Sequence, residues 1–336
     1  MRKLIPCILI LMLWFGCDDS LINPISDTPQ KTIEDISHAP VDWISFSPDG
    51  EYMISASPED ENFWSNIIVR NVSNSNFDTT IKYQIPDSVI TRQFTVVSSG
   101  ILTENFNTTE KYFIVGRKNG VNLYEFRTTG GAKLFRSISI PGDVTQLALY
   151  NDSLLVCGNN IGAIKIWDLK NDRLVRSITA HTGAISGILI TQNGKTIITS
   201  SFDNSLTIWR VSDGKALHTM YHDNSVTGIS ISPDEKYLVS VGLDKNIHLW
   251  NPISGDWYRT IKDNDWINAV AFSPDKSTIA TGGDDNIVKL WDVSTGKKIT
   301  AINNHSGRIL ALAYSRDGKY LASSAADKKI IITEMK

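Results

Sequence analysis

Cysteine is scarce in this sequence, which has three in 336 residues: Cys7, Cys17 and Cys157. Small exported domains that depend on disulfides carry a larger, closely spaced set, so a disulfide framework is not expected. Cys157 lies in the strand-like run LLVCG, where a small buried thiol is the natural interpretation. Cys7 and Cys17 belong to an apolar amino-terminal segment.

The sequence has no excess of positive charge. Lys and Arg number 33 against 36 Asp and Glu, which gives a formal net charge of -3 and an isoelectric point near 6.1. A protein that binds a phosphate backbone needs a basic surface, so nucleic-acid binding is not expected. No Walker loop, dinucleotide fingerprint or calcium loop occurs either, and no cofactor is expected.

The apolar run near the amino terminus is too short to cross a membrane. Residues 1–17 read MRKLIPCILILMLWFGC, with a basic head at Arg2 and Lys3 followed by about a dozen mostly apolar residues. A spanning helix needs about 20 apolar residues, and Pro6 interrupts this run. The pattern therefore predicts a signal peptide over residues 1–16.

Gly16 and Cys17, which end the apolar run, resemble the processing box of bacterial lipoproteins. The resemblance implies that Cys17 carries the lipid and that the protein is anchored to the inner or outer membrane of a bacterial cell envelope. Ordinary secretion, without a lipid on Cys17, remains the alternative. Residues 17–31 are predicted to be the lipidated cysteine and a polar tether, because they contain Pro24 and Pro29 and lack a strand or helix period.

The chain repeats itself from residue 32 to its end. Trp167, Trp209, Trp250 and Trp291 are spaced by 42, 41 and 41 residues. Four clear copies occupy 180–210, 221–251, 263–292 and 304–334, and weaker copies occupy 41–71, a stretch ending at 115–126, and 142–168. The sequence thus contains seven copies, of which the second is lengthened by an insertion near residues 98–110.

Each copy predicts four short antiparallel strands. Apolar residues alternate with period two, as at Ile229 and Ile231, and turn-forming words such as SPDE and LDKN separate the runs. One such sheet cannot bury both of its faces, whereas seven sheets closed into a ring can. We therefore predict an all-β, seven-bladed propeller over residues 32–336. The last copy ends on its third strand, so the segment Lys31–Ile36 is predicted to complete the last blade.

The repeats resemble the WD40 family over about nine-tenths of the chain. In that family a His, a Ser or Thr, an Asp and a Trp form one hydrogen-bonded chain, and the fourth repeat here contains a full set in His181, Ser201, Asp203 and Trp209. The resemblance assigns the same structural role in the following three repeats to His222, Asp244, Trp250, Asp285, Trp291, His305 and Asp327. Gly242 stands at the hydroxyl position of the fifth repeat, and Asp263 at the His position of the sixth.

His181, Ser201 and Asp203 are also the residue types of a hydrolase triad. The sequence has no nucleophile elbow or oxyanion motif beside them, so the structural interpretation is preferred and no enzyme is expected. The remaining histidines, His38, His218 and His248, are isolated in the sequence, and no metal site is expected because ligation needs converging side chains.

The family resemblance implies partner binding on the face formed by loops that enter the blades. Trp266 and Arg308 stand where other repeats have Ala184 and Ser225, and Trp and Arg are typical interface anchors. The flanking candidates are Asp265, Asn268, Asp42 and Trp43. These residues predict a monomeric, non-catalytic scaffold for an unidentified protein or peptide, unless Trp266 packs on its own loop. The alternative function is an envelope enzyme or carbohydrate-binding propeller with its site at the channel mouth.

Overall fold

The computed structural model describes residues 30–34, 40–46, 52–57, 64–72, 79–86, 90–97, 111–126, 133–151 and 153–335. The predicted signal peptide, Cys17, most of the tether, His38 and the insertion at 98–110 lie outside these ranges. Within the described ranges no helix has the length and apolar character needed to span a bilayer.

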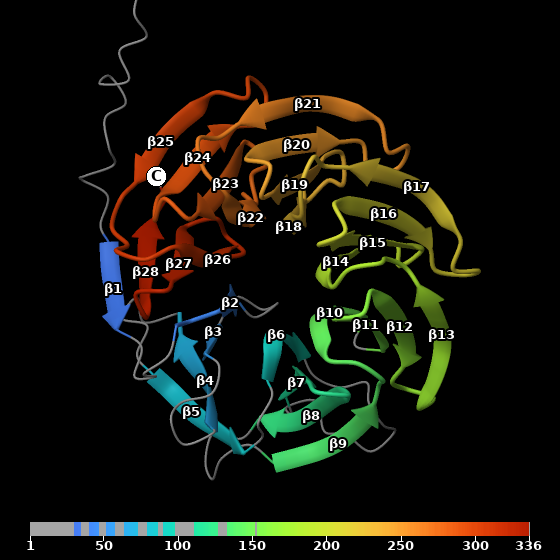
Figure 1. Ribbon diagram of the computed structural model, residues 1–336. Helices are drawn as coiled ribbons and strands as arrows, with labels where there is room; N and C mark the ends of the chain where they lie inside the picture. The colour runs from blue at the N-terminus through green and yellow to red at the C-terminus, as the bar shows by residue number, and fades with distance from the viewer. Residues whose placement is uncertain are drawn as a thin grey trace, which may run out of the picture.

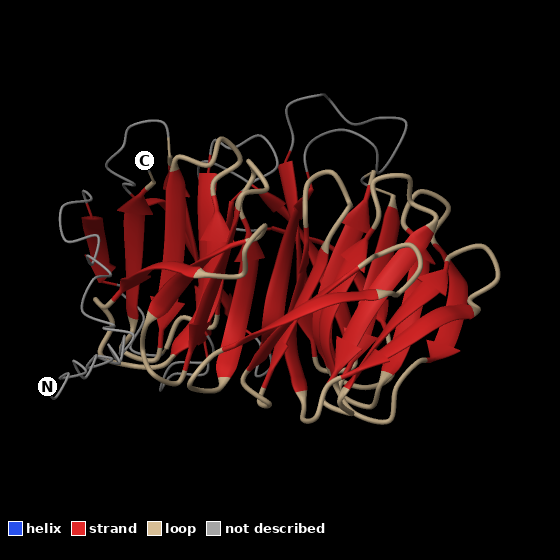
Figure 2. Ribbon diagram, turned by 90° about the horizontal axis from the view of Figure 1, so that it is seen from above, coloured by secondary structure: helices blue, strands red, loops and turns tan. Residues whose placement is uncertain are grey.

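Seven four-stranded antiparallel sheets form a closed ring around a central axis (Figure 1). This confirms the predicted all-β, seven-bladed propeller. Figure 2 shows the ring from its side, with loops gathered at two opposite faces. The first strand of each sheet lines the axis and the fourth lies on the outer rim.

The strand bounds follow the repeats. Blades 1 to 3 consist of β2 (Trp43–Phe46), β3 (Tyr52–Ser57), β4 (Trp64–Asn71) and β5 (Thr79–Pro86); β6 (Ile90–Val97), β7 (Lys111–Arg117), β8 (Gly120–Phe126) and β9 (Lys133–Ser139); and β10 (Val144–Tyr150), β11 (Leu154–Asn159), β12 (Ala163–Asp168) and β13 (Arg173–Thr179). Blades 4 and 5 consist of β14 (Ile185–Ile190), β15 (Thr196–Ser201), β16 (Ser205–Arg210) and β17 (Ala216–Tyr221); and β18 (Val226–Ile231), β19 (Leu238–Gly242), β20 (Asn246–Trp250) and β21 (Trp257–Lys262). Blades 6 and 7 consist of β22 (Ile267–Phe272), β23 (Thr278–Gly283), β24 (Val288–Asp292) and β25 (Lys298–Ile302); and β26 (Ile309–Tyr314), β27 (Tyr320–Ala325), β28 (Lys329–Glu334) and β1 (Gln30–Glu34).

The amino-terminal strand β1 closes the ring as predicted. It pairs antiparallel with β28, in a register that runs from Gln30 opposite Thr333 to Glu34 opposite Lys329. β1 begins two residues before the predicted propeller boundary at 32 and ends before Ile36. Blade 7 therefore combines the two ends of the folded chain.

Apolar side chains are buried between neighbouring blades. Ile164 and Ile166 of blade 3 pack against Ile185 and Ile197 of blade 4 in one buried cluster. A corresponding cluster at the junction of blades 7 and 1 contains Val41, Ile44, Met53, Tyr320, Ala322, Ile330 and Ile332. Each of these clusters covers the facing sheets of two adjacent blades.

Candidate functional site

The loops that enter the blades lie at the same face as the turns between the second and third strands. In an antiparallel blade the first strand starts, and the second ends, at one edge of the sheet. Backbone hydrogen bonds join the two kinds of loop: Phe202 N donates to Ala184 O at 3.0 Å in blade 4, and Asp284 N donates to Trp266 O at 3.1 Å in blade 6. We call this end of the propeller the loop face.

In blade 4 a buried hydrogen-bonded chain runs from a carboxylate to an indole. His181 Nδ1 donates to Asp203 Oδ2 at 3.0 Å, and Thr199 Oγ1 donates to His181 Nε2 at 2.8 Å. Trp209 Nε1 donates to the same Thr199 oxygen at 2.8 Å. Asp203 lies in the tight turn between β15 and β16, in which Asn204 has a left-handed φ of 71°. This turn places the Asp203 carboxylate beside the histidine.

The prediction that Ser201 supplies the hydroxyl of this chain is wrong. Trp209 pairs directly with Ile197, so its indole reaches the hydroxyl two residues further along β15, at Thr199. Ser201 lies another two residues away, about 7 Å along the strand. Its Oγ accepts a hydrogen bond from Asp203 N at 3.1 Å. Ser201 is therefore not paired with the histidine in the way that a hydrolase nucleophile requires.

Blade 5 has a complete chain, contrary to the prediction that Gly242 leaves it without a hydroxyl. His222 Nδ1 donates to Asp244 Oδ2 at 3.0 Å, and Ser240 Oγ donates to His222 Nε2 at 2.7 Å. Trp250 Nε1 donates to Ser240 Oγ at 2.8 Å. The error has the same cause as in blade 4, because the hydroxyl belongs to Ser240, two residues before the position that was predicted for it.

Blade 7 keeps the histidine part of the chain. His305 Nδ1 donates to Asp327 Oδ2 at 3.1 Å, and Ser323 Oγ lies 2.9 Å from His305 Nε2. Thr333 replaces the tryptophan, and Ser323 Oγ also reaches Ile331 O at 3.3 Å. The 22-residue separation of His and Asp thus brings the pair together in blades 4, 5 and 7.

Blade 6 replaces the imidazole with an ion triad. Asp263 occupies the histidine position, and Lys289 Nζ contacts both Asp263 and Asp285, the latter at 2.5 Å. Lys289 is buried, and hydrogen bonds from its ammonium to the two carboxylates raise its pKa even though burial alone would lower it. Trp291 Nε1 still donates to Thr281 Oγ1 at 2.8 Å. The lysine was not anticipated from the sequence.

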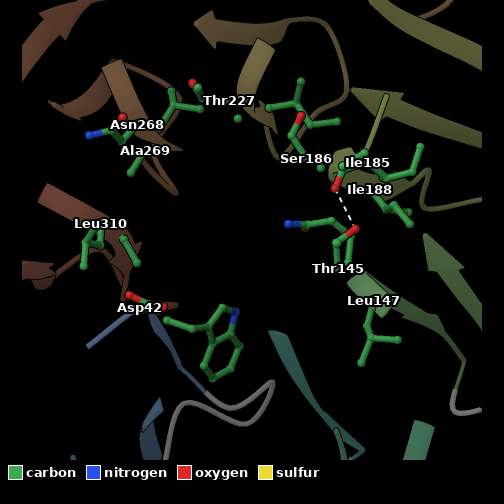
Figure 3. Close-up of a pocket in the computed structure, with 18 of the residues that line it drawn as sticks. Asp42, Thr145, Leu147, Ile185, Ser186, Ile188, Thr227, Asn268, Ala269 and Leu310 are labelled. Atoms are coloured by element: carbon green, nitrogen blue, oxygen red, sulfur yellow. Dashed lines mark hydrogen bonds between the residues drawn. The ribbon is translucent and has the colours of Figure 1, made fainter. Parts of the chain in front are cut away.

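Three of the partner-binding candidates line the mouth of the central channel. Asp42, Trp43 and Asn268 border a cavity of about 870 Å³ at the axis. Asn268 Nδ2 donates to Asp284 Oδ1 at 2.7 Å and to Ile309 O at 3.2 Å, so this side chain also ties blade 6 to blade 7. Figure 3 shows Asp42 and Asn268 on different blades around this opening.

Side chains at a repeated bulge surround the same opening. The first strands of blades 3 to 7 each shift register at their second residue, which places Thr145, Ser186, Thr227, Asn268 and Leu310 around the cavity (Figure 3). Thr145 Oγ1 donates to Ile185 O at 2.7 Å, and Thr227 Oγ1 donates to Ile267 O at 2.5 Å. These bonds join adjacent blades and make the channel mouth a preformed surface.

The other three candidates stand on loops of the same face, outside the cavity lining. Trp266 is 47% exposed and Arg308 is exposed, each three residues after the histidine position of its repeat. Asp265 Oδ1 accepts a hydrogen bond from Trp266 N at 2.8 Å, which fixes that loop. Phe202, which was not among the predicted residues, is 50% exposed on the turn before Asp203 and borders the cavity.

Comparison with known proteins agrees with this geometry. The family described as WD domain, G-beta repeat matches residues 172–210, 214–251, 255–292 and 296–333. Residues 172–333 thus consist of WD40 repeats, within a seven-bladed β-propeller. WD40 propellers typically serve as non-catalytic scaffolds for protein interactions.

Several curated proteins match parts of this WD40 propeller. Retinoblastoma-binding-like protein E of Dictyostelium discoideum is 36% identical over 19% of this chain and 12% of its own length. Autophagy-related protein 16 of Arabidopsis thaliana is 32% identical over 21% of this chain and 14% of its own length. The p21-activated protein kinase-interacting protein 1-like of Gallus gallus is 29% identical over 32% of this chain and 28% of its own length. The matched segments thus cover under a third of each relative.

In this WD40 propeller, blade 1 uses an arginine where the family has tryptophan. Arg70 pairs with Met53 as Trp209 pairs with Ile197, and Arg70 Nη1 donates to Ser55 Oγ at 2.7 Å. The buried guanidinium thus takes the hydrogen bond that the indole makes elsewhere. Strand register reveals this equivalence, whereas the sequence pattern around Arg70 did not.

Blade 3 keeps the tryptophan but has lost its acceptor. Cys157 occupies the position of Thr199, since Trp167 pairs with Leu155 as Trp209 pairs with Ile197. Trp167 Nε1 is buried and finds no hydrogen-bond partner among the described residues. Burial raises the pKa of the Cys157 thiol far above its usual range, which keeps it protonated.

The histidine–aspartate pairs of blades 4 and 7 are held as neutral imidazole and carboxylate. Burial lowers the pKa of His181 and of His305, and the facing carboxylates offset this only in part. Burial alone would raise the pKa of Asp203, but hydrogen bonds from Ser205 and Thr182 and the adjacent histidine lower it overall. Both members of the pair therefore bind protons more weakly in the fold than in the unfolded chain.

We expect the free energy of unfolding to fall as the pH drops from 7.5 to 5. Because the pKa of His181 and His305 is lowered from 6.5, the unfolded chain binds more protons, so stability is lost as the pH falls below about 6.5. Urea unfolding at several pH values measures this slope. The variant His181→Asn with His305→Asn should unfold more easily but show a smaller slope. An unchanged slope would contradict the assignment.

Proposed function

We propose that this WD40 propeller is a non-catalytic scaffold that binds a protein or peptide on its loop face. The observation that carries the proposal is Trp266, which is 47% exposed on a loop fixed by Asp265 and by the backbone of Asp284. Large aromatic side chains on rigid loops are typical anchors of protein interfaces. Arg308 offers a second anchor on the neighbouring blade.

Two further apolar side chains extend this surface. Phe202 is 50% exposed on the turn between β15 and β16, and Ile161 is 62% exposed on the corresponding turn between β11 and β12. Both turns belong to the loop face by strand order. A partner that covers Trp266 and reaches toward the channel mouth would bury these groups as well.

A photo-crosslinking amino acid at position 266 is expected to capture one discrete partner in intact cells. The matched control replaces Ile253, which is 79% exposed on the turn between β20 and β21, at the opposite face. Gel separation and mass spectrometry identify the crosslinked protein. Equal capture from both positions, or capture from position 253 alone, would contradict binding at the loop face.

Alanine variants then measure the contribution of each anchor. Trp266→Ala and Arg308→Ala should each weaken binding of the captured partner by about 2 kcal/mol or more while leaving the melting temperature unchanged. Trp257→Ala is the control, since Trp257 is 58% exposed on the outer strand β21. It should leave binding unchanged.

We further propose that a lipid on Cys17 anchors the propeller to the bacterial cell envelope. The support is the pattern of residues 1–17, with its basic head, short apolar run and terminal Gly-Cys. Residues 18–29 precede β1, and twelve residues can extend at most about 40 Å. The lipid would therefore hold the propeller close to the membrane surface.

Cys17→Ser is expected to release the protein from the membrane fraction. In cells fed an alkyne fatty acid, the parent chain should be labelled and should sediment with membranes, whereas the variant should be unlabelled. Cys7→Ser is the control and should behave like the parent chain. Labelling of Cys17→Ser at the parent level would refute this anchor.

Small-ligand binding at the channel mouth is a second candidate function. The cavity of about 870 Å³ combines the Trp43 indole with polar groups such as Asn268 and Thr145, a composition suited to a carbohydrate. Trp43→Ala would then abolish binding of an oligosaccharide from a glycan array, while Trp266→Ala would not. A propeller that binds no glycan on such an array would leave the protein partner as the function.

A further inference from the structure

Two histidines and an aspartate meet in blade 5. His222 comes from the loop before β18, Asp244 from the turn after β19, and His248 from β20. Asp244 Oδ2 lies 3.0 Å from His222 Nδ1 and 3.7 Å from His248 Nε2. The two imidazole rings stand edge to face with centroids 4.4 Å apart. The sequence-based prediction that His248 is isolated is therefore wrong.

We propose that blade 5 binds Zn²⁺ through His222 Nδ1, Asp244 Oδ2 and His248 Nε2. Each of the three residues offers one ligand atom, and these atoms all lie within 4.8 Å of one another. Ligands of a tetrahedral zinc ion, with bonds of about 2.0–2.1 Å, are about 3.3 Å apart. Side-chain movements of about an ångström would therefore complete the coordination triangle.

Each imidazole already has a hydroxyl at the ring nitrogen that faces away from Asp244. Ser240 Oγ lies 2.7 Å from His222 Nε2, and Thr260 Oγ1 lies 2.8 Å from His248 Nδ1. Metal-binding histidines usually donate their second ring N–H to such a group, which fixes the ring and its tautomer. On zinc binding the His222 proton would move from Nδ1 to Nε2, where the serine oxygen accepts it.

The remaining surroundings also suit a divalent cation. The side chain of Asp244 is only 3% exposed and contacts both imidazoles. Asn246 Nδ2 donates a hydrogen bond to Asp244 Oδ2 at 3.1 Å, which leaves the fourth position to a water molecule. Asp223, whose backbone N–H donates to Asp244 at 3.3 Å, adds a second negative charge nearby.

The neighbouring blades show why the site would be confined to blade 5. In blade 6 the residue equivalent to His248 is Lys289, whose ammonium already bridges the carboxylates of Asp263 and Asp285. This part of a blade therefore accepts a cation. In blade 4 the equivalent residue is Thr207, which supplies no imidazole, and a hollow of about 380 Å³ remains beside His181. This zinc proposal is independent of the partner proposed for the loop face.

Calorimetric titration of Zn²⁺ into the full chain, after removal of metal with a chelator, tests the proposal. We expect one ion per chain and a melting temperature that rises with zinc concentration, because binding to the folded state stabilises it. Co²⁺ in place of Zn²⁺ should give the intense visible absorption of tetrahedral coordination. The absence of binding up to millimolar zinc would overturn the proposal.

The variant His248→Thr separates coordination from folding. Blade 4 folds with threonine at this position, so the variant should keep its circular dichroism spectrum yet bind zinc about 100-fold more weakly or worse and lose the Co²⁺ absorption. His218→Thr is the matched control, because His218 is exposed on β17 of the neighbouring blade. It should bind zinc like the parent chain. Equal affinity of the His248→Thr variant and the parent would refute the site.

Discussion

Replacing Lys289 with threonine is expected to lower the free energy of unfolding by about 3–5 kcal/mol. The lysine is 7% exposed and lies between Asp263 and Asp285, with no imidazole in this blade to share their charge. Removing the ammonium leaves the buried carboxylate of Asp263 close to the partly buried carboxylate of Asp285, and this like-charge pair is costly where water is largely excluded. Chemical denaturation of the parent and the Lys289→Thr variant measures the difference.

A second substitution should restore most of the lost stability. Asp263→His together with Lys289→Thr recreates the arrangement of blade 4, in which His181 and Thr207 occupy these positions. Thr281 already bonds to Trp291 and can donate to the new imidazole as Thr199 does in blade 4. We expect the double variant to lie within about 1 kcal/mol of the parent. A double variant as unstable as Lys289→Thr would show that the triad does not replace the histidine chain.

Deleting residues 30–34 is expected to cost about 3–5 kcal/mol and to promote self-association. These residues form β1, which pairs with β28 at five positions. The backbone hydrogen bonds of this pairing contribute about 1 kcal/mol each. Without β1 the β28 edge of blade 7 is unpaired, and an open edge strand pairs readily with another chain. Thermal unfolding and size-exclusion chromatography report the two effects.

A deletion of equal length provides the control for this prediction. Residues 22–26 lie in the predicted tether, before β1, so their removal should leave both the melting temperature and the oligomeric state unchanged. A propeller that loses residues 30–34 with as little effect as this control would mean that β1 does not close the ring.

The repeat spacing was sufficient to predict the fold. Tryptophans 41 or 42 residues apart, with alternating apolar residues between them, can bury their faces only by stacking sheet on sheet, and seven copies close a ring. The missing fourth strand of the last copy located β1 to within two residues of its observed start. These inferences succeeded because they depend on local periodicity and on the number of strands.

The hydrogen-bonded chains were predicted less accurately. The 22-residue separation of His and Asp located those pairs, since both sit on loops of fixed length. The hydroxyl was misplaced by two residues because the choice between Thr199 and Ser201 depends on strand register. Lys289 and Arg70 were missed for another reason. Lys289 takes over the role of the histidine from a different strand position, and Arg70 makes the hydrogen bond of the tryptophan with a guanidinium. Both replacements become visible only in the folded sheet.

Only some of the candidate binding residues could be judged correctly from the sequence. Trp266 and Arg308 align with small residues of other repeats, and this contrast was visible in the sequence. Whether Asn268 is free for a partner depends on a neighbouring blade, and its amide is already bonded to Asp284 and Ile309. His222 and His248 are 26 residues apart in the sequence, so their meeting at Asp244 follows from the pairing of β19 with β20.

The closed ring is tested most directly by a disulfide between β1 and β28. Thr32 lies opposite Ile331, so Thr32→Cys with Ile331→Cys, in a chain that also carries Cys7→Ser and Cys17→Ser, should crosslink on mild oxidation. The crosslinked chain should melt at a higher temperature than its reduced form, because the bond closes a loop of nearly the whole propeller. Thr32→Cys with Thr219→Cys, on the outer strand of blade 4, should not crosslink. A Thr32→Cys thiol that stays reactive and never joins position 331 would contradict the closed propeller.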